Sequence, residues 1–432
     1  MSLKPKSILF YSFLLNLFLL LLFAHKILDH TPFLDDIETI SLGHFKHGLN
    51  YFDWHEKKLW FRPLEYYVYA LLSLVNSVNL IVVLSFSCVA LAGAIGAAIV
   101  ASNPSFAAPA YAFISGVALT LNPIIASPSF RISIFSQCMS NMLAAVLLWQ
   151  AIQLRRNYVF IALVFLVGAL SKESFIPYLL LAAIIFWLRD KTPKILWFAG
   201  LLTVAYFVAR HSVIDYKLLA AIDRYKVGLG LNVFKNFLLH LGGLSYFGSS
   251  PDLFAGHFVR EWPSIAVSAA FWLFVAIHLR FSPLTRAKTY ILLFAGISLF
   301  PGIFTQGVAE HNVSAFVYFV LLYILYSLQE RVASRVLLPL LMVVSIVFSA
   351  AIWQKTSLLA DTIKDFRRMR ALAQAGEPVT CLRKFEKPYS FYTMNSEKHS
   401  GWYLVYDKPG LPPPACAPEV GEGRPLPPSP AR

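Results

Sequence analysis

Long apolar stretches that are almost free of charge recur along this chain and limit what it can fold into. A helix of roughly 20 apolar residues crosses a bilayer core about 30 Å thick. Charged residues occupy only 14% of the 432 positions and hydrophobic residues 57%, whereas a soluble domain is about 25% charged. The stretches are continuous rather than alternating, so they predict membrane-spanning helices and exclude an outer-membrane barrel.

The predicted fold is therefore all-α, a polytopic transmembrane bundle of about 11 spans. Several predicted spans are shorter than about 17 residues, so we expect their helices to extend into polar flanks or to be broken. The N-terminal stretch has no small-residue cleavage site and is predicted to be a retained first span. The spans cover residues 8–23, 78–100, 107–121, 139–154, 158–170, 175–188, 195–208, 265–279, 290–300, 313–328 and 336–353.

Basic residues in the short loops predict the orientation. Cytoplasmic loops collect Lys and Arg, and only the loop at 102–106 lacks them on the side that holds the N-terminus. We therefore expect an integral protein of a bacterial inner (cell) membrane, with a cytoplasmic N-terminus and an extracytoplasmic C-terminus. The loop residues concerned are Lys4, Lys6, Arg155, Arg156, Arg189, Lys191, Lys194, Arg280, Arg286, Lys288, Arg331 and Arg335.

The same topology divides the chain into a transmembrane module, residues 1–353, and an outer tail, residues 354–432. The module has two long outer loops, 28–76 and 210–264, and long loops often carry function. The tail is rich in Pro and is expected to be disordered from about residue 408. Because an outer tail permits oxidation, we expect a disulfide between Cys381 and Cys416, with two free thiols as the alternative.

The net charge of +14 would suggest nucleic acid as a partner of a soluble protein. Here the cytoplasmic loops, together with a site for phosphorylated lipid, account for it. The chain shows no nucleic-acid motif and no Gly-rich nucleotide-binding loop. We therefore expect membrane lipid and no nucleic acid among its partners.

The first outer loop carries the adjacent acids Asp35 and Asp36. A carboxylate at a membrane surface can accept the proton of an attacking hydroxyl or amine, which is general-base chemistry. The alternative is that the pair caps the start of a helix. The sequence requires no cofactor, although the two carboxylates could bind a divalent metal ion.

Further ionisable residues fall on the same predicted outer face. Lys172 and Glu173 lie between the fifth and sixth spans, where an ion pair that only marks the loop is the alternative. Arg62 precedes a stretch rich in Tyr that suits an interfacial helix, either in contact with substrate or as a simple aromatic anchor. The other members of this group are Arg210, at the end of the seventh span, and Glu310 and His311, before the tenth.

In their order and sidedness these residues resemble the GT-C fold of polyprenyl-phosphate-sugar glycosyltransferases, which includes protein O-mannosyltransferases and aminoarabinose transferases. The resemblance covers roughly residues 1–328. It implies that Asp35 or Asp36 is the catalytic base and that Lys172 and Arg210 bind the donor phosphate. It also implies that the cavity is lined by Arg62, Glu173, Glu310 and His311, where many relatives carry Arg in place of His311.

The resemblance implies transfer of a sugar from a polyprenyl-phosphate carrier to a protein, lipid or glycan acceptor whose identity the sequence does not give. Two alternatives remain open. One is a polytopic transporter or lipid flippase, although internal repeats and midplane charges typical of transporters are lacking. The other is an O-antigen polymerase or ligase that uses lipid diphosphate donors, against which only the first-loop Asp pair argues.

Overall fold

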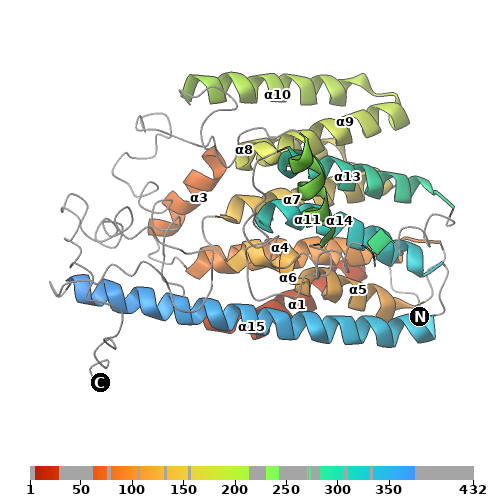
Figure 1. Cartoon of the computed structure of the whole chain (residues 1–432). Helices are drawn as coiled ribbons and strands as arrows, with labels where there is room; N and C mark the ends of the chain where they lie inside the picture. Colours follow the sequence, from red (N-terminus) through yellow and green to blue (C-terminus); the bar gives the residue numbers. More distant parts are fainter. Residues whose placement is uncertain are drawn as a thin grey trace.

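The computed structural model confirms the all-α prediction for the part of the chain that it describes, where all the secondary structure is helical. The described residues are 5–28, 62–74, 79–104, 108–130, 134–153, 157–213, 230–242, 270, 272–273, 283–304, 310–330 and 334–374. Most of the long helices run side by side as a bundle (Figure 1).

Several helices of the first half begin at Pro. Pro fits the first turn, where the missing N–H would have no helical partner, and it is the first residue of α1, α3, α5 and α6. The elements are α1 (Pro5–Ala24), η1 (His25–Ile27), α3 (Pro63–Leu74), α4 (Asn79–Ala101), α5 (Pro109–Leu121), α6 (Pro123–Ala126), η4 (Ser127–Phe130) and α7 (Phe135–Ile152).

Side-chain caps mark helix starts in the second half. The side chain of Asn157 accepts a hydrogen bond from the Phe160 amide, and that of Thr285 accepts one from the Lys288 amide, as N-cap residues do. The elements are α8 (Tyr158–Ser171), η6 (Glu173–Phe175), α9 (Ile176–Asp190), α10 (Pro193–Val213), α11 (Leu231–Gly242), α13 (Arg286–Ile303), α14 (Glu310–Leu328) and α15 (Ser334–Gln374).

Five of the described helical segments are long and apolar enough to cross a membrane. They are Pro5–Ile27, Leu80–Ala101, Phe135–Ile152, Pro193–Ser212 and Arg335–Ser357. A sixth forms if α5 and Pro123–Phe130 make one span, which bends by 57°. Asn122 lies at this bend, where its side chain accepts hydrogen bonds from the amides of Ile124 and Ile125. These helices indicate an integral membrane protein.

The predicted count of 11 spans is not confirmed. Every predicted span except 265–279 falls on a described helix, but several of these helices are short. α8 and α9 have 14 and 15 residues, which at 1.5 Å per residue reach about 20 Å, against a bilayer core of about 30 Å. Lys172 and η6 lie between these two helices, so α8 and α9 do not join into one longer apolar helix.

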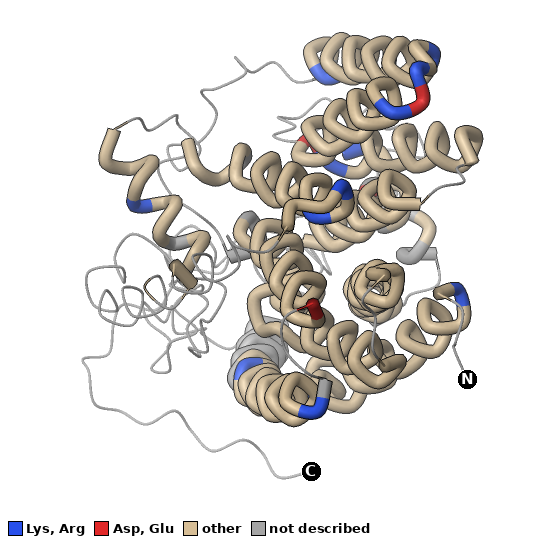
Figure 2. Tube along the Cα trace, turned by 90° about the vertical axis from the view of Figure 1, so that its right-hand side faces the viewer, with Lys and Arg blue, Asp and Glu red and all other residues tan. Residues whose placement is uncertain are grey.

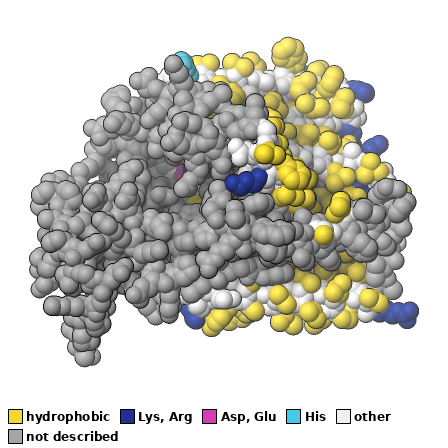
Figure 3. Space-filling model, viewed as in Figure 1, with side chains coloured by type: hydrophobic (Ala, Val, Ile, Leu, Met, Phe, Trp, Pro, Cys, Tyr) yellow, Lys and Arg dark blue, Asp and Glu magenta, His cyan; other side chains and the backbone are white. Residues whose placement is uncertain are grey.

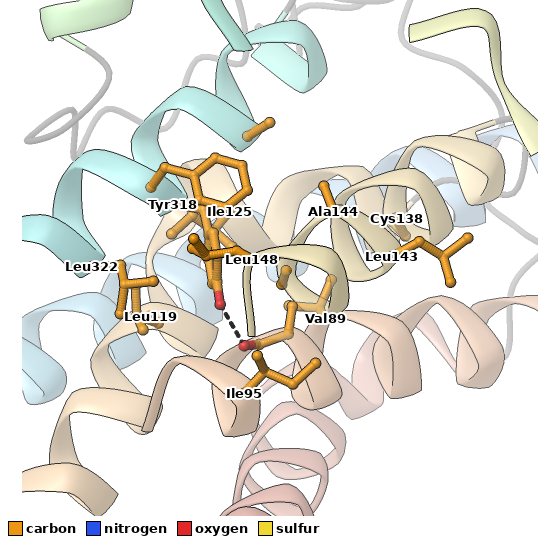
Figure 4. Packing of buried hydrophobic residues seen from close by; sticks show 14 of the residues in the cluster. Val89, Ile95, Leu119, Ile125, Cys138, Leu143, Ala144, Leu148, Tyr318 and Leu322 are labelled. Carbon is orange, nitrogen blue, oxygen red and sulfur yellow. Dashed lines mark hydrogen bonds between the residues drawn. The ribbon is translucent and has the colours of Figure 1, made fainter. Parts of the chain in front are cut away.

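Small residues allow α4 and α5 to approach closely. A Cβ atom added at Gly93 would lie 2.9 Å from the carbonyl oxygen of Gly116, and it would also meet the Thr120 hydroxyl. Membrane helices commonly associate through such small residues. The Tyr318 hydroxyl of α14 donates a 2.7 Å hydrogen bond to the Ala92 carbonyl of α4 among packed apolar side chains (Figure 4). α4 is therefore held by both α5 and α14.

Charged residues of the described helices are few and lie mostly near helix ends (Figure 2). At one end of the bundle three segments predicted to be cytoplasmic meet. Lys288 is fully buried there and pairs with Glu330. Asn103 also donates a 3.2 Å hydrogen bond to Glu330. These contacts tie the ends of α4, α13 and α14 together.

α15 is 41 residues long, about 60 Å at 1.5 Å per residue, and runs along the whole bundle (Figure 1). It continues through residue 353, so the first part of the predicted tail is helical as far as Gln374. Lys26, beyond the end of α1, donates a hydrogen bond to Ser357 and lies over the Trp353 ring. Cys381, Cys416 and the Pro-rich stretch lie outside the described residues.

The outer surface of the described bundle is apolar over wide areas (Figure 3). Phe18, Trp197 and Ile346 each expose more than half of their surface. Apolar patches of this extent on a soluble protein would mark a binding site or cause aggregation. On a membrane protein they are the surface that faces lipid.

Candidate functional site

Arg62 connects two segments that are far apart in sequence. It lies directly before α3, and its guanidinium donates to both carboxylate oxygens of Glu173, at 3.3 and 3.5 Å. A third contact, of 3.4 Å, reaches Glu65 in the first turn of α3. Such a fork holds a planar guanidinium in one orientation.

Glu65 fixes this group to the start of α7. Its second carboxylate oxygen accepts a 3.4 Å hydrogen bond from the backbone amide of Ser136, the second residue of that helix. The first amides of a helix have no helical acceptor and carry partial positive charge. A buried carboxylate is therefore stabilised at this position.

Lys172 is almost completely buried, with 6% of its surface exposed. It lies between α8 and η6 with an extended backbone, and its ammonium donates a 2.6 Å hydrogen bond to the Gln137 side chain. The Gln137 amide donates to Asn141 at 2.7 Å, and Asn141 donates to Ser314 at 2.9 Å. A chain of hydrogen bonds thus leads from Lys172 along α7 to α14.

The break in the helix that presents Lys172 follows from its neighbours. Gly168 leaves room for the Phe175 ring, which a Cβ atom at residue 168 would overlap. The Ser171 hydroxyl donates a 2.8 Å hydrogen bond to the Gly168 carbonyl and so occupies an acceptor in the last turn of α8. The chain leaves the helix at Lys172 and restarts in η6.

Charges within the site perturb its titration. Burial lowers the pKa of Lys172 to about 8, and repulsion by Arg62 adds to this, while Glu173 and Glu65 oppose it. Burial raises the pKa of Glu173, but Arg62 and Lys172 outweigh that effect and the net pKa lies below its ordinary value. Glu173 is therefore ionised at neutral pH, and Lys172 is close to releasing its proton.

Buried hydroxyl groups border the same cluster. The side-chain oxygens of Ser136, Ser140 and Ser174 are inaccessible to solvent and have no hydrogen-bond partner within the described part of the chain. Ser136 and Ser140 flank Gln137 on α7, and Ser174 follows Glu173 in η6. Buried hydroxyls without partners are unfavourable unless another group binds them.

The structure brings together three of the predicted site residues, Arg62, Lys172 and Glu173. Glu310 and His311 are the first two residues of α14 and lie within about one turn of Ser314, although nothing is described of their side chains. Arg210 lies in the last turn of α10 and has no described contact with the cluster. Asp35 and Asp36 lie outside the described residues.

Four cluster residues were missed in the sequence: Glu65, Gln137, Asn141 and Ser314. A signal for two of them was present, because Gln137 and Asn141 are four residues apart in an otherwise apolar helix and so share one face. Glu65 carried no such signal. Its role depends on the approach of α3 to α7, which only the tertiary structure reveals.

Within the described residues no group of three or more His, Cys, Asp or Glu side chains could hold a metal ion. The predicted metal-binding pair, Asp35 and Asp36, is outside that part of the chain. No family model matches the chain, and comparisons with curated proteins and with solved structures find no match either.

Proposed function

We propose that the chain is a membrane glycosyltransferase that moves a sugar from a polyprenyl-phosphate carrier to an acceptor on the extracytoplasmic face of a bacterial inner membrane. The observation that supports it best is the cluster of Arg62, Lys172 and Glu173. These residues come from two segments that the sequence predicts to lie on one face of the membrane, and Arg62 and Glu173 are in direct contact. The buried ammonium of Lys172, close to hydroxyls that have no partner among the described residues, suits an anionic ligand.

In the proposed reaction an acceptor O–H attacks the anomeric carbon of the sugar. The bond from that carbon to the phosphate oxygen breaks, and polyprenyl phosphate leaves with the electron pair. The acceptor proton passes to Asp35 or Asp36, acting as general base. Lys172 and Arg62 stabilise the charge that develops on the leaving phosphate oxygen.

The remaining residues have positioning roles in this proposal. Glu173 holds the Arg62 guanidinium through two hydrogen bonds, while Glu65 holds it from the other side. Arg210 is a second phosphate-binding residue, and Glu310 and His311 contact the substrate from the start of α14. No resident metal ion is required for these steps, although Asp35 and Asp36 could bind one.

One observation favours a transporter as the second candidate. α5 and Pro123–Phe130 form a bent pair with a break at Asn122, and broken helices line the substrate sites of many transporters. The charged cluster argues for the enzyme, because it lies at the ends of α3, α7 and α8 rather than in the middle of a span. A polymerase or ligase that uses lipid diphosphates would need the same cations.

The decisive experiment incubates the purified protein in lipid nanodiscs with a panel of polyprenyl-phosphate sugars and peptide, lipid and glycan acceptors. The enzyme releases polyprenyl phosphate, and Arg62→Gln and Lys172→Met remove that release. Lys191→Gln, in the exposed loop between α9 and α10, is the matched control and leaves activity intact. Turnover with diphosphate donors alone would indicate the polymerase or ligase. Transport into vesicles without turnover would indicate the transporter.

The proposed orientation has its own test. A reporter fused after Arg156 is expected to be cytoplasmic, and one fused after Gln374, at the end of α15, extracytoplasmic. Both reporters on one side of the membrane would contradict the orientation. The cluster would then have to be assigned to a face by direct labelling.

A further inference from the structure

α11 has its apolar and polar faces reversed relative to a helix that covers a soluble core. It lies in the predicted outer loop 210–264 and is not among the helices long enough to cross a membrane. Leu231, Phe234 and Phe237 follow one another at intervals of three residues and are exposed, Phe234 by 62%. Asn236 and His240 are buried on the opposite side.

The polar face of α11 is fixed to the bundle. The Asn236 side chain donates hydrogen bonds to the carbonyls of Gly302 and Ile303, at 3.3 and 3.0 Å. These carbonyls belong to the last turn of α13, where helical donors are lacking. The His240 ring donates from Nδ1 to the Asn236 carbonyl at 2.7 Å and meets Phe316 of α14 edge-on. The exposed apolar face is therefore a consequence of specific contacts.

The length of α13 indicates the depth at which α11 lies in a membrane. The predicted span 290–300 falls on α13, which is not among the five segments that are apolar enough to cross a membrane alone. Its 18 residues reach about 27 Å at 1.5 Å per residue, which is close to the thickness of a bilayer core. α11 sits at the end of α13 and runs across the direction of the long helices (Figure 1). Phe300 and Phe304, at this end of α13, are also exposed, so apolar side chains continue from one helix to the other.

We propose that α11 is a membrane-surface helix, whose Leu231, Phe234 and Phe237 insert into the acyl chains of the leaflet in which α13 ends. Helices with one large apolar face lie in the interface in this way. Asn236 and His240 hold α11 against α13 and α14, so the loop that carries α11 follows the membrane surface. The placement of α11 at the membrane surface is independent of the reaction proposed above.

Nitroxide accessibility tests this placement in the full chain, reconstituted in phosphatidylcholine and phosphatidylglycerol vesicles. Phe234→Cys and, in a second protein, Phe237→Cys carry the spin label in a background in which the native cysteines are replaced by Ala. Ile346→Cys on α15 is the lipid-facing control, and Lys191→Cys is the water-facing control. The replaced native cysteines are Cys88, Cys138, Cys381 and Cys416.

Labels at residues 234 and 237 are expected to collide with oxygen much more often than with a water-soluble nickel chelate, as the label at residue 346 does. A ratio like that of the label at residue 191 would place α11 in water and overturn the proposal. Low accessibility to both reagents would show that protein covers the face, which would also overturn it. Two labelled positions guard against a local effect of either substitution.

Discussion

Replacement of Lys172 by Met is expected to abolish activity without destabilising the protein. Lys172 is buried and donates a hydrogen bond to Gln137, but no carboxylate lies within ion-pair distance of its ammonium among the described residues. A lysine kept for stability would have such a partner. A buried lysine that serves to bind an anionic substrate lowers the stability of the protein when no substrate is bound.

The size of this penalty follows from the pKa of Lys172, which is about 8 against 10.5 for a solvated lysine. A tenfold loss of proton affinity is worth about 1.4 kcal/mol, so the difference corresponds to roughly 3 kcal/mol of unfavourable charge at neutral pH. Loss of the hydrogen bond to Gln137 offsets about 1 to 2 kcal/mol of the gain. Lys172→Met is therefore expected to leave the free energy of unfolding unchanged or to raise it by up to about 2 kcal/mol.

The pH dependence has a defined sign. Below pH 8 the lysine is protonated in both the folded and the unfolded chain, and the buried charge destabilises the folded state to its full extent. Between about 8 and 10.5 the unfolded chain holds a proton that the folded chain has released, so stability rises with pH. The free energy of unfolding of the wild type should therefore rise relative to that of Lys172→Met across this pH range. Other titrating groups cancel in the difference between the two proteins.

The assay is reversible unfolding in mixed micelles, followed by tryptophan fluorescence from pH 7 to 10.5, with turnover measured on the same samples. Lys288→Met is the matched control, because Lys288 is also fully buried but pairs with Glu330. That variant removes the Lys288 cation from Glu330, and its free energy of unfolding is expected to fall by about 1 to 3 kcal/mol. Two results would refute the reasoning. One is a fall of more than about 1 kcal/mol in the free energy of unfolding of Lys172→Met at pH 7. The other is a difference in stability between the wild type and the variant that does not change above pH 8.

Three further results are expected. Gly93→Ala should lower the free energy of unfolding by about 1 to 3 kcal/mol through overpacking. Gly200→Ala is the control, because its Cβ atom would meet no atom within 4 Å, and it should not lower this free energy measurably. Chemical unfolding in micelles measures both variants. Donor affinity should fall as pH rises through about 8, because neutral Lys172 no longer attracts the phosphate; Lys172→Arg should abolish this dependence in equilibrium binding. Asp35→Asn or Asp36→Asn should reduce turnover by roughly 10² to 10⁴ at one position; full activity in both variants and in the double variant would exclude a carboxylate base.

The helices of this chain were largely predictable because each depends on its own apolar run and local start signals. α4 and α7 lie within a few residues of their predicted spans, and Pro or capping side chains mark several beginnings. The bend at Asn122 was not predicted. The Asn122 side chain caps the short helix α6. A single Asn between two apolar segments also occurs in ordinary loops, so the residue alone does not predict a bend.

The site was predictable only in part, for a different physical reason. Lys172 and Glu173 stood out because charges next to spans are unfavourable, and Arg62 because it precedes an interfacial stretch. Their direct contact depends on the position of α3 against α7 and α8, which no local pattern encodes. Gln137 and Asn141 are uncharged and gave a weaker signal, although they supply the hydrogen-bond partners of the buried lysine.

The residues of the cluster differ in how far the fold depends on their charge. Glu65 binds both Arg62 and the first turn of α7, so its loss would free a helix end and displace the guanidinium together. Activity lost in a Glu65 variant would therefore not distinguish chemistry from folding. The ammonium of Lys172 donates its hydrogen bond to a neutral side chain, that of Gln137, and its buried charge destabilises the folded state. Its substitution separates the two effects, because activity is expected to be lost while stability is retained or increased.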